Sequence, residues 1–323
     1  MASLLSVENL QVQFQTKKGI NTAVDGVSFF VEKGRILGIV GESGCGKSVT
    51  SMSILQLLGS NARISGGSIK LDGKELIGLP EKEMCRIRGN DIAMIFQDPM
   101  TALNPTLTIG TQLMEPIMLH QNCGKKEAWT RAVDVLKRVG IAAPEKRMKE
   151  YPHQLSGGMR QRVMIAMAVS CEPRLLIADE PTTALDVTIQ AQILELMCEL
   201  REKMGTAIML ITHDMGVVAE TADDVLVLYA GKAVEYGSIE DIFERPKHPY
   251  TQGLLNSIPR LDEDVELLNT IEGTVPAPDA MPAGCRFAPR CPYGKDRCMK
   301  EKPGVYHAGN SLVSCFRYEG EKE

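Results

Sequence analysis

The sequence predicts an α/β protein with a nucleotide-binding core. Three short strings carry this prediction: GESGCGKS at residues 41–48, LSGGMRQR at residues 155–162 and LLIADEPTTALD at residues 175–186. The first has the form GxxxxGKS/T, which is typical of a loop that wraps phosphate groups. The third is an apolar run that ends in two carboxylates, as expected of a buried strand that delivers them to Mg²⁺ and water.

The phosphate loop has a suitable context. RILGIV at residues 35–40 reads as a buried strand, and the segment 48–58 reads as a helix whose N-terminus faces the phosphates. The three loop glycines, Gly41, Gly44 and Gly46, permit backbone conformations that let amide N–H groups converge on phosphate oxygens. Lys47 can reach the β- and γ-phosphates, and Ser48 can offer its hydroxyl to Mg²⁺.

The two carboxylates of the third string divide the work. Asp179 is expected to hold the Mg²⁺ shell, and Glu180 to polarise the attacking water. The second string adds another anion site, because Ser156, Gly157 and Gly158 precede a helical run and would place amide groups at its N-terminus. A chain with two phosphate-binding elements is expected to hold nucleotide from two sides.

The remaining elements follow from periodicity and turn residues. Residues 1–35 alternate apolar and polar positions, as in an antiparallel sheet, and SIKLDGKEL at 68–76 predicts a hairpin that turns at Asp72-Gly73. The pattern is helical over 98–162, where Gly140 is expected to end one helix. We therefore expect residues 1–97 and 163–245 to form a RecA-like and β core, 98–162 a helical subdomain, and 246–323 a small Cys-rich C-terminal extension.

Charge and hydropathy exclude other classes of protein. The 323 residues include 36 Lys and Arg against 41 Asp and Glu, so a nucleic-acid role has no electrostatic basis. No apolar run approaches the length of a membrane span, and the N-terminus lacks the layout of a signal peptide. The composition suits a cytoplasmic enzyme that reaches a membrane only through partner proteins.

Further strings support a family resemblance. They are IFQDPMTALNP at 95–105, YPHQLSGG at 151–158, ITHD at 211–214, HPYTQGLL at 248–255 and a late segment with four cysteines. Together with the first three strings, they make the chain similar to the ATP-binding subunits of ABC transporters. More narrowly, the chain resembles the D-type ATP-binding subunits of bacterial dipeptide and oligopeptide importers.

The resemblance implies a role for individual residues. Gln97 and His213 would join Glu180 in catalysis, Gln97 at Mg²⁺ and water and His213 at the γ-phosphate. Asp186 would cross to the opposite site, and Phe14 would stack on adenine. The expected Mg²⁺ ligands are Ser48, Gln97 and Asp179. The expected ATP-binding set is Phe14, Gly41, Ser43, Gly44, Cys45, Gly46, Lys47, Ser48, Val49, Gln97, Asp179, Ser156, Gly157, Gly158 and Asp186.

The cysteines raise two further expectations. Cys45 lies beside Lys47 at a helix N-terminus, so we expect a thiolate that reacts with alkylating reagents. The late four, Cys285, Cys291, Cys298 and Cys315, lie in a segment with little apolar material, so a staple is expected there. A disulfide does not suit a reducing cytosol, zinc usually takes shorter Cys spacings, and four thiolates with a Pro after Cys291 suit an iron–sulfur cluster. The resemblance also implies a 4Fe–4S cluster, with zinc as the second choice and no metal as the third.

The sequence thus predicts an ATPase that powers peptide import at the cytoplasmic face of the inner membrane. Its expected cofactors are ATP, Mg²⁺ and the 4Fe–4S cluster. The resemblance implies a paralogous ATPase subunit as dimer partner, or a second copy of this chain, with two permeases and, indirectly, a peptide-binding protein. Three alternatives stay open: import of another solute such as a nickel complex, a soluble ABC ATPase outside transport, and a P-loop kinase or GTPase, which would lack the LSGGMRQR string.

Overall fold

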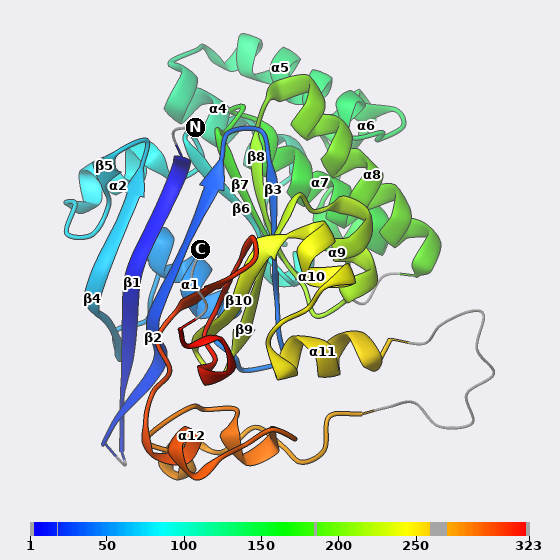
Figure 1. Cartoon of the computed structure of the whole chain (residues 1–323). Helices are drawn as coiled ribbons and strands as arrows, with labels where there is room; N and C mark the ends of the chain where they lie inside the picture. The colour runs from blue at the N-terminus through cyan, green and yellow to red at the C-terminus, as the bar shows by residue number, and fades with distance from the viewer. Residues whose placement is uncertain (1–2, 18, 184–185, 259–269, 321–323) are drawn as a thin grey trace. The chain divides into compact units, whose positions relative to one another are not determined.

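The computed structural model describes residues 3–17, 19–183, 186–258 and 270–320. The chain divides into two compact units, whose helices and strands are labelled in Figure 1. The first unit comprises residues 1–31, 36–77 and 212–323, and the second comprises residues 32–35 and 78–211. The phosphate loop lies in the first unit, and the strand that ends in Asp179 lies in the second. Residues 184 and 185 of the third string lie outside the described residues.

An antiparallel sheet opens the first unit, in the strand order β2-β1-β4-β5. The alternating pattern of the N-terminal segment predicted this sheet, since Leu10 and Val12 of β1 are buried while neighbouring positions are partly exposed. The predicted turn is confirmed: Asp72 and Gly73 both have positive φ, 49° and 80°, as a two-residue hairpin requires. The strands are β1 (Ser3–Thr16), β2 (Gly19–Glu32), β4 (Ala62–Leu71) and β5 (Lys74–Glu75).

A second set of strands in the first unit has the order β11-β12-β10-β9-β3. All five residues of β3 are buried, and β3 runs parallel to β9, as expected of the central strand before a phosphate loop. Antiparallel pairing of β12 with β10 adds the end of the chain to this sheet. The strands are β3 (Ile36–Val40), β9 (Asp224–Tyr229), β10 (Lys232–Ser238), β11 (Tyr306–Ala308) and β12 (Ser311–Val313).

The helices of the first unit are short. The first of them follows the phosphate loop and ends four residues before the predicted Leu58, because Gln56 takes a left-handed φ of 51°. The helices are α1 (Lys47–Ile54), α9 (Met215–Thr221), α10 (Ile239–Glu244), α11 (Pro249–Asn256) and α12 (Asp296–Lys300), with 3₁₀ turns η2 (Pro278–Ala280), η3 (Ala288–Arg290) and η4 (Phe316–Tyr318).

The second unit combines three parallel strands with most of the helices. Strand β7 (Leu175–Asp179) lies between β6 (Ile92–Ile95) and β8 (Ala207–Ile211), and all residues of β7 and β8 are buried. Gly140 has a φ of 76° just after α5, which confirms it as the residue that ends this helix. The helices are α2 (Glu81–Ile87), α3 (Pro99–Ala102), α4 (Ile109–Gln121), α5 (Lys125–Arg138), α6 (Pro144–Arg147), η1 (Pro152–Gln154), α7 (Gly157–Val169) and α8 (Val187–Met204).

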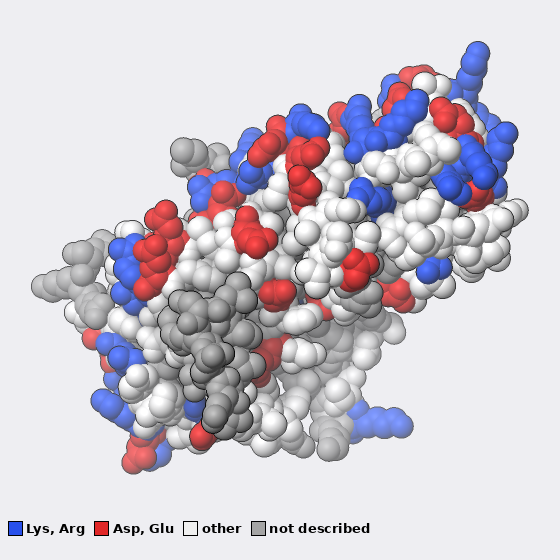
Figure 2. All heavy atoms as spheres, turned by 90° about the vertical axis from the view of Figure 1, so that its right-hand side faces the viewer, with Lys and Arg blue, Asp and Glu red and all other residues white. Residues whose placement is uncertain are grey.

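None of the helices in the described ranges is long and apolar enough to cross a membrane. Charged side chains of both signs are interspersed on the face shown in Figure 2, where basic and acidic groups neighbour one another. This distribution agrees with the nearly balanced charge of the sequence.

The segment after residue 245 packs against strand β9 through a cluster of aromatic side chains. Phe287 is 2% exposed and packs edge-on against Tyr229 of β9, with ring centroids 5.1 Å apart. Tyr250 of α11 lies 4.7 Å from Tyr229 and 5.4 Å from Phe287, and His248 lies 5.7 Å from Phe287. Packing between aromatic rings at such distances stabilises a fold beyond the area that it buries. This cluster and the β12–β10 pairing anchor the segment to the sheet.

Buried polar groups fix the turn before α11. The carboxylate of Glu235 accepts the N–H groups of Lys247 and His248 at 2.7 and 2.8 Å. The Nδ1 atom of His248 accepts the N–H of Tyr250 at 3.1 Å, which caps the helix. Burial lowers the pKa of His248 to about 3, so its imidazole stays neutral and can act as this acceptor.

We therefore expect His248 to make the folded chain less stable as the pH falls. Below its ordinary pKa of 6.5 the unfolded chain binds a proton that the folded chain does not bind until about pH 3, so the free energy of unfolding decreases as pH falls. His248→Asn retains an acceptor but cannot titrate. As the pH falls through this window, the free energy of unfolding of the unaltered chain should drop relative to that of the variant by roughly 1.4 kcal/mol per pH unit, measured by urea unfolding. Equal pH dependence in both chains would contradict the buried, neutral imidazole.

The first loop glycine should also be essential to the fold. Gly41 has a φ of 151°, and a Cβ atom there would lie 2.1 Å from the carbonyl oxygen of Leu228 in β9. Gly44 also has a positive φ, 77°, but a Cβ atom there would meet nothing within 4 Å. We expect Gly44→Ala to cost about 1 kcal/mol and Gly41→Ala clearly more, measured by thermal unfolding. Equal losses in the two variants would argue against the close backbone contact.

Candidate nucleotide-binding site

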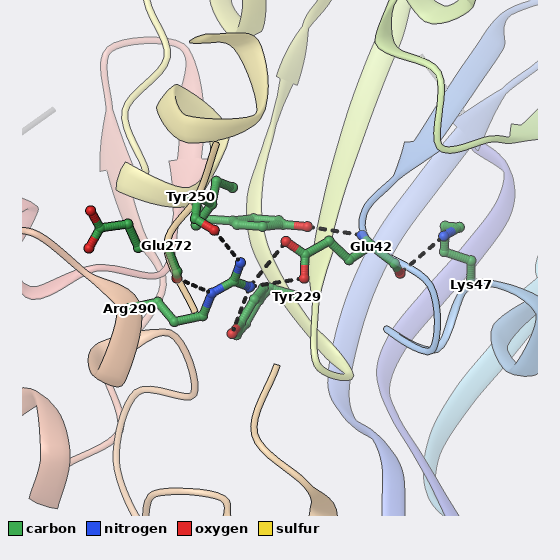
Figure 3. A network of polar contacts seen from close by, with 7 residues as sticks. Glu42, Lys47, Tyr229, Tyr250, Glu272 and Arg290 are labelled. Atoms are coloured by element: carbon green, nitrogen blue, oxygen red, sulfur yellow. Dashed lines mark hydrogen bonds and ion pairs between the residues drawn. The ribbon is translucent and has the colours of Figure 1, made fainter. Parts of the chain in front are cut away.

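The phosphate loop connects β3 to α1 in the first unit, and its lysine is already in place. Gly46 precedes α1 with a left-handed φ of 100°. The Lys47 side chain is only 6% exposed, and its Nζ donates to the carbonyl oxygens of Gly41 and Glu42 at 2.7 and 3.2 Å. Figure 3 shows this ammonium group directed at the loop. The cation that phosphate binding requires is therefore held by carbonyls of the loop itself.

Several of the loop residues that are predicted to contact ATP are accessible. Ser43, Gly44 and Ser48 are exposed, and Val49 is partly exposed, so their amide and hydroxyl groups can face a ligand. Thr50, which the sequence reasoning did not single out, donates its hydroxyl to Gly46 at 2.9 Å and fixes the start of α1. The exposed Ser48 hydroxyl in the first turn is the kind of oxygen donor that Mg²⁺ prefers.

The expectation of a reactive thiolate at Cys45 is wrong. Its side chain is 1% exposed, and its Sγ lies 4.0 Å from the Lys47 Nζ. Burial raises the pKa of the thiol by more than the Lys47 charge lowers it. Cys45 is therefore a buried thiol that packs under the loop, and no local sequence pattern indicates this burial.

The second unit brings two predicted catalytic residues together. Gln97 Nε2 donates to Glu180 Oε2 at 2.9 Å. Thr183, which sequence reasoning missed, donates its hydroxyl to the same oxygen at 2.9 Å. Glu180 follows β7 with a left-handed φ of 47°, uncommon for a residue other than Gly, and its N–H donates to Ile211 at 2.8 Å. Such strained backbone is concentrated at functional sites. Asp179, at the end of β7, is 5% exposed.

The second phosphate-binding element forms the N-terminus of α7, a helix of 13 residues. The Ser156 side chain caps this helix by accepting the Met159 N–H at 3.3 Å. Ser156 and Gly157 are exposed, so the first amides of the helix are open to an anion. Gln161 donates to the carbonyl oxygen of Pro181, which connects α7 to the segment after Glu180. Sequence reasoning had not identified Gln161.

The remaining predicted residues lie on other elements. His213 is exposed in the first unit and follows Thr212, whose N–H donates to Ile39 of β3 at 3.2 Å. Asp186 caps α8, because its carboxylate accepts the Ile189 N–H at 2.9 Å. Phe14 lies near the end of β1, opposite Ala62 of β4, and is partly exposed.

The prediction of a metal centre at the four late cysteines is wrong. Cys285, Cys291, Cys298 and Cys315 line one cavity of about 80 Å³, yet no group of three His, Cys, Asp or Glu side chains within the described ranges could hold a metal ion. Burial raises the pKa of the Cys285 thiol to about 11. The 4Fe–4S prediction is therefore wrong, and the zinc alternative has no support either. Sheet pairing and the aromatic cluster hold the segment that was expected to need a staple.

Comparisons with known proteins give the context of this site. Residues 24–183 match a family model described as ABC transporter, and residues 234–298 match one described as the C-terminal region of oligopeptide/dipeptide transporters. The chain is 56% identical to the oligopeptide transport ATP-binding protein AppD of Bacillus subtilis, over 99% of this chain and 98% of the relative. It is 51% identical to the oligopeptide transport ATP-binding protein OppD of Escherichia coli, over 98% and 93%.

A solved structure agrees with this relationship. The ATP-binding cassette MJ0796, a dimer in a post-hydrolysis state with ADP and phosphate, matches with a TM-score of 0.66 and 27% identity. The match covers 73% of this chain and 98% of that cassette. The phosphate loop, the Gln97–Glu180 pair and the open end of α7 thus occur in a cassette fold with mixed α/β sheets. The chain belongs to the ABC transporter family of ATP-binding proteins and carries the C-terminal region of its oligopeptide/dipeptide transporters.

Proposed function

We propose that this ABC ATPase hydrolyses ATP to energise the import of dipeptides or oligopeptides, acting at the cytoplasmic face of the inner membrane. The observation that carries the proposal is the extent of the similarity. It runs through the cassette and through the C-terminal region of oligopeptide/dipeptide transporters, in a chain that retains the phosphate-loop lysine in a buried position. The names of its relatives refer to peptide transport, which favours this reading over nickel complexes and over ATPases outside transport.

The proposed working unit is a pair of cassettes. The open N-terminus of α7 on one subunit would close over the ATP phosphates bound at the Lys47 loop of the other, because a helix N-terminus stabilises negative charge. The dimeric cassette MJ0796 supports this arrangement. The second cassette is a paralogous ATPase or a second copy of this chain. Two permeases and a peptide-binding protein would complete the importer.

Hydrolysis would use the residues predicted from the sequence. Lys47 would neutralise the phosphates, and Ser48, Gln97 and Asp179 would be the oxygen ligands of a bound Mg²⁺, which would neutralise phosphate charge. Glu180 orients the attacking water and accepts its proton. The Gln97 bond to Glu180 supports this role, because it holds the carboxylate in a defined position. His213 would contact the γ-phosphate, Phe14 would stack on adenine, and Asp186 would reach the opposite site.

We further propose that residues 98–162 are the subdomain that meets the permeases. Exposed apolar side chains support this proposal, since an exposed apolar surface marks an interaction site. Leu119 of α4 is 70% exposed, Met118 is 41% exposed, and Met100 of α3 is 56% exposed. When ATP closes the pair of cassettes, this subdomain would move and so move the membrane subunits that it contacts.

Glu180→Gln provides the test of the catalytic assignment. The amide cannot accept the proton of water, so turnover should fall by about 10²- to 10⁴-fold. ATP binding should survive, because Lys47 and the loop are unchanged, and the variant should accumulate as an ATP-bound dimer. Steady-state hydrolysis, equilibrium ATP binding and gel filtration with ATP provide these readings. A folded variant with normal turnover would remove Glu180 from the mechanism.

The transported solute is tested by uptake in the native host. Deletion of the gene should abolish most uptake of labelled di- and oligopeptides and leave nickel uptake unchanged. A plasmid copy of the gene should restore peptide uptake, whereas a copy with Glu180→Gln should not, because binding without turnover cannot drive transport. Loss of nickel uptake alone would show that peptides are not the transported solute. Unchanged uptake of both peptides and nickel would argue against a transport role.

A further inference from the structure

The second residue of the phosphate loop, Glu42, is held by side chains from the C-terminal region of the chain. Both carboxylate oxygens of Glu42 accept from Arg290 Nη1, at 3.0 and 2.9 Å. The N–H of Glu42 donates to the hydroxyl oxygen of Tyr250 at 2.9 Å. Its carbonyl oxygen accepts from Lys47 Nζ at 3.2 Å. Figure 3 shows these contacts converging on Glu42, so all three of its polar groups are fixed.

Arg290 is built for this position. Its side chain is 6% exposed, while that of Glu42 is 29% exposed. Its Nε donates to the carbonyl oxygen of Glu272 at 2.9 Å, and its Nη2 donates to that of Ile271 at 3.1 Å. Nη1 also reaches the Tyr229 hydroxyl at 3.4 Å. A planar guanidinium with several fixed donors can orient a carboxylate more strictly than a flexible ammonium group can.

We propose that Arg290, together with Tyr250, positions the phosphate loop: by holding Glu42, it holds the start of the loop in the conformation that receives the ATP phosphates. Lys47 must exchange its bonds to the Gly41 and Glu42 carbonyls for phosphate oxygens when ATP binds. The position of the Glu42 backbone therefore sets the starting point of that exchange. Because a preorganised site binds more tightly than one that must first be ordered, loss of the Arg290 contact should weaken nucleotide binding.

The residues that position the loop lie outside the part of the chain that matches the ABC transporter family model. Arg290 and Tyr250 fall within residues 234–298, whereas Glu42 and Lys47 fall within residues 24–183. The C-terminal region thus acts on the affinity of the cassette for ATP. This inference rests on ATP binding at the loop, which is part of the proposed function.

The test compares MgATP affinity and steady-state ATP hydrolysis in matched variants. Arg290→Met removes the charge and keeps the length of the side chain, and Glu42→Gln replaces the carboxylate by an amide of the same shape. Each should weaken MgATP binding and raise KM by about 5- to 10-fold. The kcat at saturating ATP should change less than about 2-fold, since the loop binds ground state and transition state alike.

A double variant separates positioning from general stability. If Arg290 acts through Glu42, the double variant should bind MgATP no more weakly than the weaker single variant, because the second change removes nothing further. Arg290→Lys should bind with intermediate affinity. Arg297→Met is the matched control: Arg297 pairs with Glu301 and stacks on Phe316 in the same segment, so affinity should stay unchanged.

Several results would overturn the inference. Folded single variants with normal MgATP affinity, or losses that simply add in the double variant, would reduce Arg290 to a structural residue. If Arg290→Met does not fold, Glu42→Gln decides the question alone, because its side chain is partly solvated. Failure of the unaltered chain to bind MgATP would instead count against the proposed function itself.

Discussion

The close approach of the phosphate loop to strand β9 is the constraint on which the site depends. At Gly41 the loop backbone comes so near to the Leu228 carbonyl that only a hydrogen atom fits on the α-carbon. The next residue along β9, Tyr229, reaches Arg290, and the next along the loop, Glu42, pairs with the same guanidinium. The loop thus begins between a buried strand and a buried cation, and its geometry is fixed before any ligand arrives. Preorganisation of this kind lowers the cost of binding phosphate.

A comparable logic operates at the carboxylates of the second unit. Glu180 occupies a left-handed conformation that costs about 1–2 kcal/mol for a residue with a side chain. The conformation is retained because its N–H bonds to Ile211, while Gln97 and Thr183 both donate to its carboxylate. Two neutral donors on one oxygen orient this carboxylate, as the proposed activation of water requires. The backbone and side chains around Glu42 and Glu180 are thus both held by several hydrogen bonds.

The local chemistry of the chain could be predicted from its sequence, whereas its long-range contacts could not. The hairpin at Asp72-Gly73 follows from turn rules, and so does the end of α5 at Gly140. The Arg290–Glu42 pair joins residues 248 positions apart, and no local pattern indicates it. The metal prediction failed for the same reason. It considered only the apolar residues within the cysteine-rich segment, but Phe287 is buried against Tyr229 and Tyr250, which come from other elements. Likewise, charge and helix position suggested a reactive Cys45, while tertiary burial decides its pKa.

The C-terminal region is proposed to fix the phosphate loop before nucleotide binds. Hydrogen–deuterium exchange of the nucleotide-free chain tests it most directly, because the Glu42 amide is bonded to the hydroxyl of the fully buried Tyr250. We expect peptides covering Glu42 and peptides covering Arg290 to exchange slowly and to lose protection together as denaturant is added. Rapid exchange at Glu42 while the Arg290 segment stays protected would contradict the account.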